Sequence, residues 1–324
     1  MAKFKIEHFK NQTATLRDLE TDECMHSSVG AWNEAQTLYV LQSQLEKRLR
    51  VPAGKRDGLT HHAHEDASKQ VEGRSPLVLY DVGLGIGANA IAALAVLKDL
   101  RWDEPKRPLH LISFEKFPEG MAYALSCVKE FPYLHGYGGL IQKLLDQREV
   151  HFVFENGGEL HWILHVGDFR DFLKGAPPPE LIYFDLYSPK RCPHLWSVQT
   201  FRRLYQKTLI RQDQGQSTLL ITYSASTAVR AALILSGFYV GYGVATSDKR
   251  DTTVASTHSA ELASPLGAPW LEKWRRSSKP YPHSVEDGAE DENENVGECG
   301  APKREEYRDK EALYSQLSKL LEKK

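Results

Sequence analysis

One stretch constrains the fold more than any other: an apolar segment enters a glycine-rich turn, and a second apolar segment ends on a carboxylate. Residues 78–89 read VLYDVGLGIGAN, and residues 109–115 read LHLISFE. Glycines adopt positive φ and lack a Cβ, so the backbone of such a turn can approach a ligand closely. Glu115 comes about one strand–helix–strand unit later, where a carboxylate can accept hydrogen bonds from both hydroxyls of a ribose. The pattern predicts a nucleoside-containing cofactor at the carboxyl ends of parallel strands.

The spacing of the glycines narrows the choice of cofactor. They form G-x-G-x-G, in which the third glycine comes one residue earlier than in the dinucleotide fingerprint G-x-G-x-x-G. Asp81 precedes the first glycine, and its carboxylate would repel a pyrophosphate at the helix N-terminus. S-adenosyl-L-methionine has no phosphate but carries an ammonium and a sulfonium, so we expect this cofactor rather than a tight turn without a ligand. The predicted cofactor-binding residues of this region are Asp81, Gly83, Gly85, Gly87, Asn89, Glu115 and Lys116.

Composition sets the general class of protein. The chain has 324 residues, of which 41% are hydrophobic and 26% charged, and this is ordinary for a globular protein of one domain with additions. No apolar run reaches the roughly 18 residues that a membrane helix needs. The N-terminus lacks the apolar core of a signal peptide, and the four cysteines form no C-x-x-C pair. We therefore expect a cytoplasmic protein without a membrane partner. Because the net charge is −2, a nucleic-acid partner would need a local basic patch.

Strand and helix patterns alternate over most of the chain, which is typical of a parallel sheet with helices on both faces. Predicted strands lie at 77–82, 109–114, 161–166, 181–186, 217–223, 238–244 and 252–257. Predicted helices lie at 88–100, 118–130, 168–174, 197–210 and 225–236. No helix separates the last two strands, which predicts an antiparallel pair at a sheet edge. The fold class predicted is α/β: the doubly wound, Rossmann-like sheet of class I S-adenosylmethionine methyltransferases.

The alternating region and the segments on either side of it define three predicted domains. Residues 1–75 form an N-terminal extension that contributes to the site: a hairpin at 3–19, a helix at 31–49 and a variable loop at 52–75. The helix would place its apolar residues on one face, namely Trp32, Ala35, Leu38, Tyr39, Leu41 and Leu45. Residues 76–262 form the methyltransferase domain. Residues 263–324 form a tail with an acidic, disordered stretch at 284–298 and a terminal helix, whose docking the sequence does not decide.

Histidines in the variable loop raise the question of a metal. His61, His62 and His64 could ligate an ion, but no second cluster of ligands supports such a site. A solvated loop is the favoured interpretation, and no metal is expected.

A second informative segment is ELIYFDLYSPKRCPHLW at 180–196. A buried strand ends at Asp185, which could hold an acceptor amine by hydrogen bonding and later take its proton. Tyr187 could stack on the acceptor or exclude water. In the alternative interpretation Asp185 only caps a loop. Asp168 follows another strand, where it could accept a hydrogen bond from the adenine amino group of the cofactor or simply cap a helix.

Further residues near predicted strand ends could contact the substrate. Two basic pairs, Lys190 with Arg191 and Lys249 with Arg250, could hold nucleic-acid phosphates at the mouth of the site, although solvated surface charge is the simpler interpretation for each residue alone. Trp196 either packs against the loop that follows Asp185 or belongs to the core. The predicted substrate-binding residues are Pro189, Lys190, Trp196, Lys249 and Arg250.

Several of these motifs carry a resemblance to a known family. ISFEKFP at 112–118, DLYSPKRCPHLW at 185–196 and the stretch 222–253 resemble the methyltransferase domain of the bacterial bifunctional enzyme of tRNA wobble-uridine modification, the 5-methylaminomethyl-2-thiouridine methyltransferase. MHSSVGAWNEA at 25–35 resembles the start of its stand-alone relatives. The resemblance covers roughly residues 4–257.

The resemblance implies a reaction and roles for residues. The family transfers a methyl group from S-adenosylmethionine to the aminomethyl nitrogen at C5 of the wobble uridine, so tRNA is the implied partner. By resemblance, Asp185 lies beside the acceptor amine and also contacts the cofactor. Glu115 binds the ribose, Glu34 closes over the cofactor, and Lys249 with Arg250 lies near the acceptor.

The sequence also departs from the family pattern. Leu186 stands where the family often has glycine, Asp251 and Thr252 stand where it often has Glu-Met, and no flavin-dependent oxidase domain is expected in this chain. Two other function classes therefore remain open. One is an enzyme that acts on a small-molecule amine, by methyl transfer or as an aminopropyltransferase. The other is a non-catalytic RNA-binding protein with a methyltransferase fold.

Overall fold

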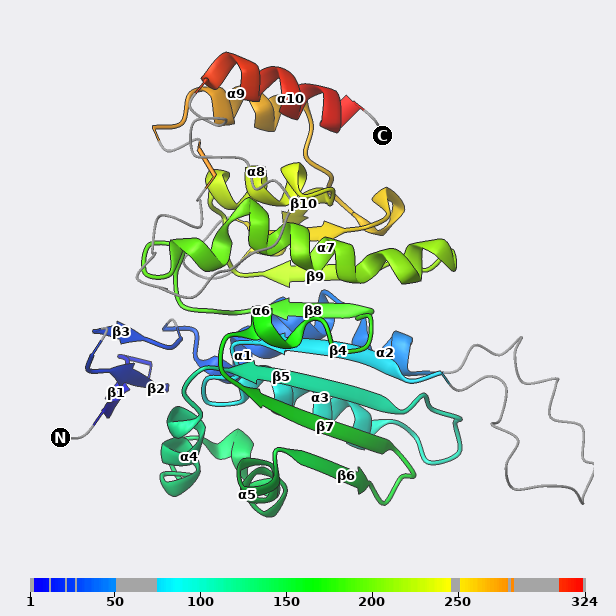
Figure 1. Cartoon of the computed structure of the whole chain (residues 1–324). Coiled ribbons are helices and arrows are strands. Elements are labelled where there is room, and N and C mark those ends of the chain that lie inside the picture. Colours follow the sequence, from blue (N-terminus) through cyan, green and yellow to red (C-terminus); the bar gives the residue numbers. More distant parts are fainter. Residues whose placement is uncertain are drawn as a thin grey trace, which may run out of the picture. The chain divides into compact units, whose positions relative to one another are not determined.

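The computed structural model describes residues 3–11, 13–20, 22–26, 28–50, 75–245, 251–278, 281–282 and 309–322. It divides into two compact units, Met1–Asp168 and Phe169–Lys324 (Figure 1). Among these residues no helix is both long and apolar enough to cross a membrane. Several predictions lie outside the described residues: nearly all of the variable loop with His61, His62 and His64, the acidic stretch at 284–298, and Lys249 with Arg250.

The first unit contains a mostly parallel sheet with strand order β4-β5-β7-β6. Strands β4 (Leu77–Val82), β5 (Leu109–Glu115) and β7 (Glu159–Val166) are parallel, as predicted, and β6 (Glu149–Val153) is antiparallel to β7. Every residue of β4 is buried, which its sequence favours because all of its residues except Asp81 are apolar or aromatic. The sequence did not reveal β6, because four of its five residues are exposed and no apolar alternation marks it.

Helices connect these strands and cover the sheet. Helix α3 (Ala88–Asp99) follows the glycine turn, and α4 (Glu119–Ser126), a 3-10 turn (Pro132–Leu134) and α5 (Gly138–Gln147) lie between β5 and β6. The predicted helices at 88–100 and 118–130 are confirmed, whereas α5 was not predicted. Because β6 and α5 both lie between β5 and β7, this connection contains one helix and one strand more than predicted.

The N-terminal extension folds within the first unit. The predicted hairpin is confirmed as β1 (Phe4–His8) and β2 (Ala14–Asp18), to which β3 (Glu23–Cys24) adds a third antiparallel strand. The continuous helix predicted at 31–49 is wrong. The chain forms α1 (Ala31–Glu34), a π-helix η1 (Ala35–Leu41) and α2 (Leu45–Leu49), with a break at Gln44, whose φ is 53°.

The π-helix explains a second error in the same segment. Leu41 was expected on the buried face, but it is 68% exposed, while Leu38, Tyr39 and Val40 are buried in succession. A π-helix has more residues in each turn than an α-helix, so the buried face moves along the sequence. Helices α1 and η1 both contact α3.

A single side chain, Arg107, joins the two chain segments that flank the undescribed residues 51–74. Its guanidinium donates to the carbonyl oxygens of Arg48, Ser75 and Pro76 at 3.1, 3.0 and 3.2 Å. Its backbone N–H donates to Leu49 O at 2.9 Å. The end of α2 and the start of β4 are therefore held together by one residue.

The second unit contains a mixed sheet with strand order β8-β9-β11-β10. Strands β8 (Leu181–Phe184) and β9 (Leu219–Thr222) are parallel. Strands β10 (Tyr239–Gly243) and β11 (Thr252–Ser256) form the predicted antiparallel edge pair. The predicted helices of this unit are confirmed as α6 (Phe169–Phe172), α7 (Val198–Asp213) and α8 (Thr227–Leu235).

Two further helices complete the second unit. Helix α9 (Ala268–Arg275) was not predicted, whereas α10 (Lys310–Glu322) is the predicted terminal helix. The described part of the tail docks: α10 contacts α8 and α9, and its Leu313, Leu317 and Leu321 are buried. The hydroxyl of Tyr314 donates to Glu272 at 2.8 Å. The apolar stripe of α10 is thus covered within its own unit.

Candidate cofactor and acceptor sites

The glycine turn between β4 and α3 has the backbone geometry that the sequence predicted. Gly83, Gly85 and Gly87 have φ values of 97°, 53° and 76°, which L-residues rarely adopt. The backbone N–H of Gly83 donates to Phe114 O at 3.0 Å, and this bond fixes the turn against β5. A Cβ on Gly87 would lie 2.6 Å from the Met121 side chain. The turn is therefore tight and close to its neighbours.

Glu115 at the end of β5 lies directly beside this turn. Its Oε2 accepts from the backbone N–H of Gly85 at 2.9 Å, and its Oε1 accepts from the N–H of Phe117 at 2.9 Å. Burial raises the pKa of the Glu115 carboxyl, while the backbone donors partly oppose that shift. Each carboxylate oxygen can accept a second hydrogen bond. The carboxylate can therefore receive two ribose hydroxyls without losing its backbone partners, so this region fits the adenosyl part of the expected cofactor.

Asp81 lies inside the sheet, next to a side chain of the neighbouring strand. Its side chain is fully buried, and Oδ2 accepts from Ser113 Oγ at 2.9 Å. Ser113 Oγ in turn accepts from the indole N–H of Trp162 at 2.9 Å. These bonds link β4, β5 and β7 inside the sheet. We propose that Asp81 fixes the strand end that carries the turn, so that its effect on a cofactor passes through the backbone.

Two aromatic residues that the sequence did not assign to the site, Tyr133 and Trp32, support the turn from outside. The hydroxyl of Tyr133 donates to Ile86 O at 3.0 Å. The Tyr133 ring stacks on Trp32 of α1, with ring centroids 5.7 Å apart and 13° between the planes. No local signal marks Tyr133, because it lies 47 positions from Ile86. The N-terminal extension therefore reaches the glycine turn through Trp32.

The remaining predicted cofactor residues of this unit take varied positions. Glu34 is half-buried in α1, which contacts α3. Asn89 is buried in the first turn of α3, and Lys116 is exposed directly after Glu115. Asp168 follows Gly167, whose N–H donates to Glu115 O at 2.9 Å. The backbone leading to Asp168 is thus bonded to the residue predicted to bind the ribose.

The predicted acceptor residues lie in the second unit, on the loop that follows β8. Two aromatic side chains hold this loop by its main chain. The indole N–H of Trp196 donates to Tyr187 O at 2.9 Å, and the hydroxyl of Tyr223 donates to Leu186 O at 3.0 Å. Asp185 directly precedes these anchored residues and is half-buried. An anchored loop can hold a carboxylate in one orientation toward an acceptor.

Trp196 belongs to the core of the second unit and also packs against the loop. It is fully buried, with its ring near Phe184, Phe201 and Tyr223 at centroid distances of 4.9, 6.4 and 5.8 Å. Trp196 therefore fits both interpretations: it belongs to the core and it contacts the loop that follows Asp185. We propose that Trp196 positions the acceptor loop rather than contacting the substrate itself.

Basic residues of the second unit divide into exposed and buried ones. Lys190 and Arg191 are exposed and follow the half-buried Pro189. Arg230 is 1% exposed: its guanidinium donates to Thr253 Oγ1 at 3.0 Å and also pairs with Asp251. Burial and these partners make Arg230 part of the interior of the second unit.

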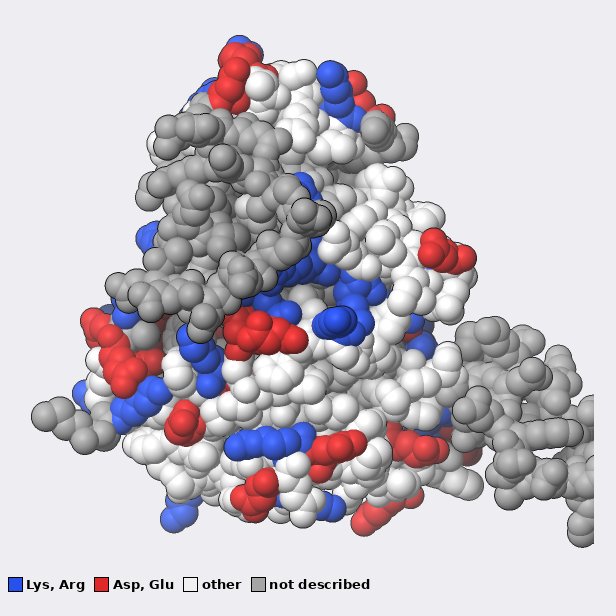
Figure 2. All heavy atoms as spheres, viewed as in Figure 1, with Lys and Arg blue, Asp and Glu red and all other residues white. Residues whose placement is uncertain are grey.

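Charged side chains on the visible face of the first unit do not form a field of one sign. Figure 2 shows Lys and Arg interspersed with Asp and Glu among broad uncharged areas, as far as the described residues drawn there extend. Attraction of a nucleic acid to this face would therefore depend on individual residues.

Comparisons with known proteins define the class. Residues 140–258 match a family described as S-adenosyl-L-methionine-dependent methyltransferase. This range contains the acceptor loop but not the glycine turn. The crystal structure of MNMC2 from Aquifex aeolicus aligns with a TM-score of 0.61 over 99% of this chain and 86% of that one, at 21% identity, which shows a shared Rossmann-like fold. The chain therefore resembles S-adenosylmethionine-dependent methyltransferases in the sequence of residues 140–258, and it shares its fold with MNMC2.

Within that class the chain is related to the methyltransferase domain of MnmC. The tRNA 5-methylaminomethyl-2-thiouridine biosynthesis bifunctional protein MnmC of Ralstonia nicotianae is 30% identical over 217 residues, which are 62% of this chain and 30% of that protein. The MnmC of Polaromonas naphthalenivorans is 27% identical over 55% of this chain and 27% of its own length. An uncharacterised protein of Methanocaldococcus jannaschii is 27% identical over 75% of this chain and 56% of its length. The chain thus spans about 30% of the length of the bifunctional relatives it matches.

Proposed function

We propose that this chain is an N-methyltransferase that uses S-adenosylmethionine to methylate the 5-aminomethyl group of the wobble (thio)uridine of tRNA. The relatives named above act in the biosynthesis of 5-methylaminomethyl-2-thiouridine, which differs from its aminomethyl precursor by this one methyl group. The observation that carries the proposal is the acceptor loop, where two hydrogen bonds to the main chain hold the residues that follow Asp185.

The first unit supplies the residues proposed to hold the cofactor. When bound, S-adenosylmethionine supplies a methyl group on a sulfonium, which a neutral amine can attack. Glu115 would accept hydrogen bonds from the ribose hydroxyls, and the backbone of the glycine turn, which carries no Cβ at Gly83, Gly85 and Gly87, would lie against the cofactor. Glu34 closes over the cofactor, and Asp168 accepts from its adenine amino group.

The second unit supplies the residues proposed to hold the amine. An ammonium has no lone pair, so the acceptor nitrogen must be neutral when it reacts. The Asp185 carboxylate accepts a hydrogen bond from this nitrogen, directs its lone pair, and takes the proton that is released after methyl transfer. Tyr187 lines the same loop and excludes water. Most of the rate enhancement comes from alignment of the amine, because an oriented reaction gains far more than proton transfer alone supplies.

The exposed basic residues provide the proposed contact with tRNA. Lys190 and Arg191, and by resemblance Lys249 and Arg250, neutralise phosphates near the acceptor nucleotide. Such contacts position the nucleic acid and carry no sequence information of their own. Recognition of the wobble base is left to the residues around Asp185 and Leu186.

The experiment that tests this function uses labelled S-adenosylmethionine and bulk tRNA from cells that lack their own wobble-uridine methyltransferase. Nucleoside mass spectrometry should reveal 5-methylaminomethyl-2-thiouridine. Asp185→Asn should remove at least about 99% of the turnover, because it keeps the shape but cannot take the proton. The variant should retain its affinity for S-adenosylmethionine by calorimetry.

Other outcomes separate the alternative functions. Methylation of polyamines or other small amines, with tRNA inert, would assign the chain to small-molecule chemistry. Loss of cofactor affinity in Asp185→Asn would show that this residue binds the cofactor rather than the acceptor amine. Binding of tRNA without methyl transfer to any amine would support a non-catalytic RNA-binding protein.

A further inference from the structure

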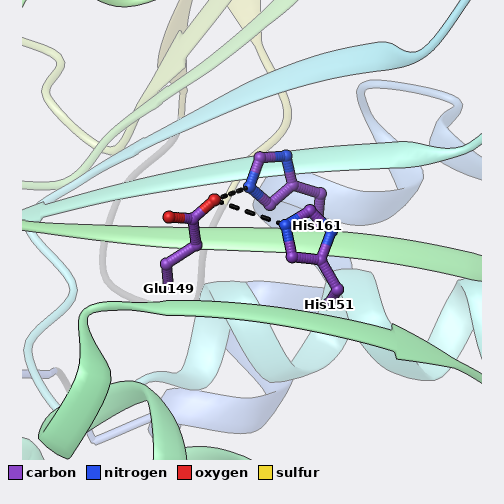
Figure 3. Close-up of side chains that lie close together, drawn as sticks. All are labelled: Glu149, His151 and His161. Carbon is purple, nitrogen blue, oxygen red and sulfur yellow. Dashed lines mark hydrogen bonds and ion pairs between the residues drawn. The ribbon is translucent and has the colours of Figure 1, made fainter.

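Three ligand-type side chains converge on one face of the sheet in the first unit, on strands β6 and β7 (Figure 3). Glu149 and His151 are two positions apart on β6, so their side chains point to the same face. His161 on β7 is the direct cross-strand partner of His151. Side chains that face each other across antiparallel strands have Cβ atoms about 5 Å apart, within reach of one ion.

The donor atoms already lie near the spacing that a metal needs. Glu149 Oε1 is 2.7 Å from His161 Nε2 and 3.3 Å from His151 Nε2. The ligand atoms of the three residues all lie within 4.8 Å of one another. A tetrahedral zinc ion with bonds of about 2.0–2.1 Å separates its ligands by about 3.3 Å. Small side-chain movements therefore convert the hydrogen-bonded cluster into a coordination site.

Exposure makes these movements possible. The two imidazole rings are stacked at 4.0 Å with 16° between their planes, so one ring must rotate before both nitrogens point at one ion. The His151 side chain is 71% exposed and can rotate, whereas His161 is 21% exposed and holds its place. His110 on β5 packs its ring at 89° against His161, with the centroids 4.9 Å apart, which orients the fixed ligand.

We propose that Glu149, His151 and His161 bind one divalent transition-metal ion of the zinc type. Two imidazoles and a carboxylate suit zinc and its neighbours better than magnesium or calcium, which prefer oxygen ligands alone. Three protein ligands leave the fourth position to water. In the bound state each imidazole coordinates through Nε2 and carries its proton on Nδ1.

The position of the cluster indicates a structural role. His161 lies near the start of β7, whereas the proposed cofactor residues lie at the carboxyl ends of the strands. Strand β6 is the outer strand of this sheet, with Phe152 and Val153 44% and 64% exposed. An ion shared by β6 and β7 would fix the outer strand in register. The site does not depend on the proposed methyl transfer.

The test is calorimetric titration of the full chain with zinc chloride. Because His61, His62 and His64 could also bind zinc, the titrations use the full chain with these three residues replaced by alanine. This protein should bind one zinc ion, and its midpoint of thermal unfolding should rise with zinc. His151→Ala should weaken binding at least about tenfold and abolish the thermal shift.

His8 provides a matched control. Its Nε2 lies 2.8 Å from Glu130 Oε2, and the two side chains are 54% and 41% exposed, so it forms a histidine–glutamate pair without a second imidazole. His8→Ala should leave zinc binding unchanged. Glu149→Gln, which removes the ligand charge from an exposed position, should weaken binding as His151→Ala does.

Either of two results would overturn the proposal. One is the absence of zinc binding in the protein that lacks the three loop histidines. The other is equal zinc affinity in the His8→Ala and His151→Ala variants. Neither result would bear on methyl transfer, which is measured separately.

Discussion

Two tyrosine hydroxyls, each bonded to a main-chain carbonyl, allow the effect on cofactor binding to be measured separately from the effect on the acceptor loop. Tyr223 donates to Leu186 O on the acceptor loop, and Tyr133 donates to Ile86 O in the glycine turn, both at 3.0 Å. Tyr→Phe removes only the oxygen in each case. The ring contacts remain, including that of Tyr223 with Trp196 at 5.8 Å and 82°.

The expected energies follow from one lost hydrogen bond. A neutral intramolecular hydrogen bond contributes about 1 kcal/mol net, so each variant should lose about that much of its free energy of unfolding. A loss of this size shifts a local equilibrium about fivefold toward conformers without the anchor. If the unanchored conformers do not transfer methyl, Tyr223→Phe should lower kcat by up to about fivefold.

The two variants should differ in which step they affect. Tyr223→Phe should keep its affinity for S-adenosylmethionine in calorimetry while kcat for methyl transfer to tRNA falls. Tyr133→Phe should weaken cofactor binding by about fivefold to tenfold, because its bond supports the turn. Unfolding in urea reports whether the stability losses match. The reasoning is refuted if Tyr223→Phe weakens cofactor binding as much as Tyr133→Phe, or leaves kcat unchanged.

Three further predictions follow from the described contacts. Burial raises the pKa of Glu115, so the folded protein keeps this carboxyl protonated at pH values above its ordinary pKa of 4.5. As the pH rises through this range, the free energy of unfolding should fall and the affinity for the cofactor should increase. Both pH dependences should vanish in Glu115→Gln, as measured by thermal unfolding and calorimetry. Gly87→Ala should cost at least about 1–2 kcal/mol of stability in urea unfolding, because a φ of 76° strains an L-residue and the new Cβ would lie 2.6 Å from the Met121 side chain. Arg230→Met should lower the free energy of unfolding by about 3 kcal/mol, because it leaves Asp251 without its buried partner; a change below about 0.5 kcal/mol would contradict the account.

The sequence correctly predicted the elements that are marked by their own apolar residues. Strands β4 and β5 are mostly apolar, and the glycines between β4 and α3 leave few other conformations, so this region was predicted closely. Strand β6 was missed because its stability comes from pairing with β7, and its residues EVHFV carry no periodic signal. The π-helix was missed because the sequence alone does not show which residues of this segment face α3, and η1 contacts α3 along its buried side.

The candidate site shows the same division between local and distant causes. Glu115 lies beside the turn, as its position after a strand predicts. The burial of Asp81 depends on Ser113 and Trp162, which are 32 and 81 positions away along the chain, and no local pattern reveals them. The anchors of the acceptor loop divide likewise: Trp196 lies within the motif, while Tyr223 lies 37 positions beyond Leu186.

The bonds made by Arg107 have a consequence for the evolution of this chain. They join the end of α2 to the start of β4 across the segment 51–74, so the contacts that define the first unit do not depend on how many residues lie between the two ends. Doubling the length of a connection costs only about 0.6 kcal/mol in closure entropy. Insertions and deletions at this place should therefore be nearly neutral for folding. A gene can vary here, acquire a peptide or a small domain, and retain the sheet that carries the glycine turn.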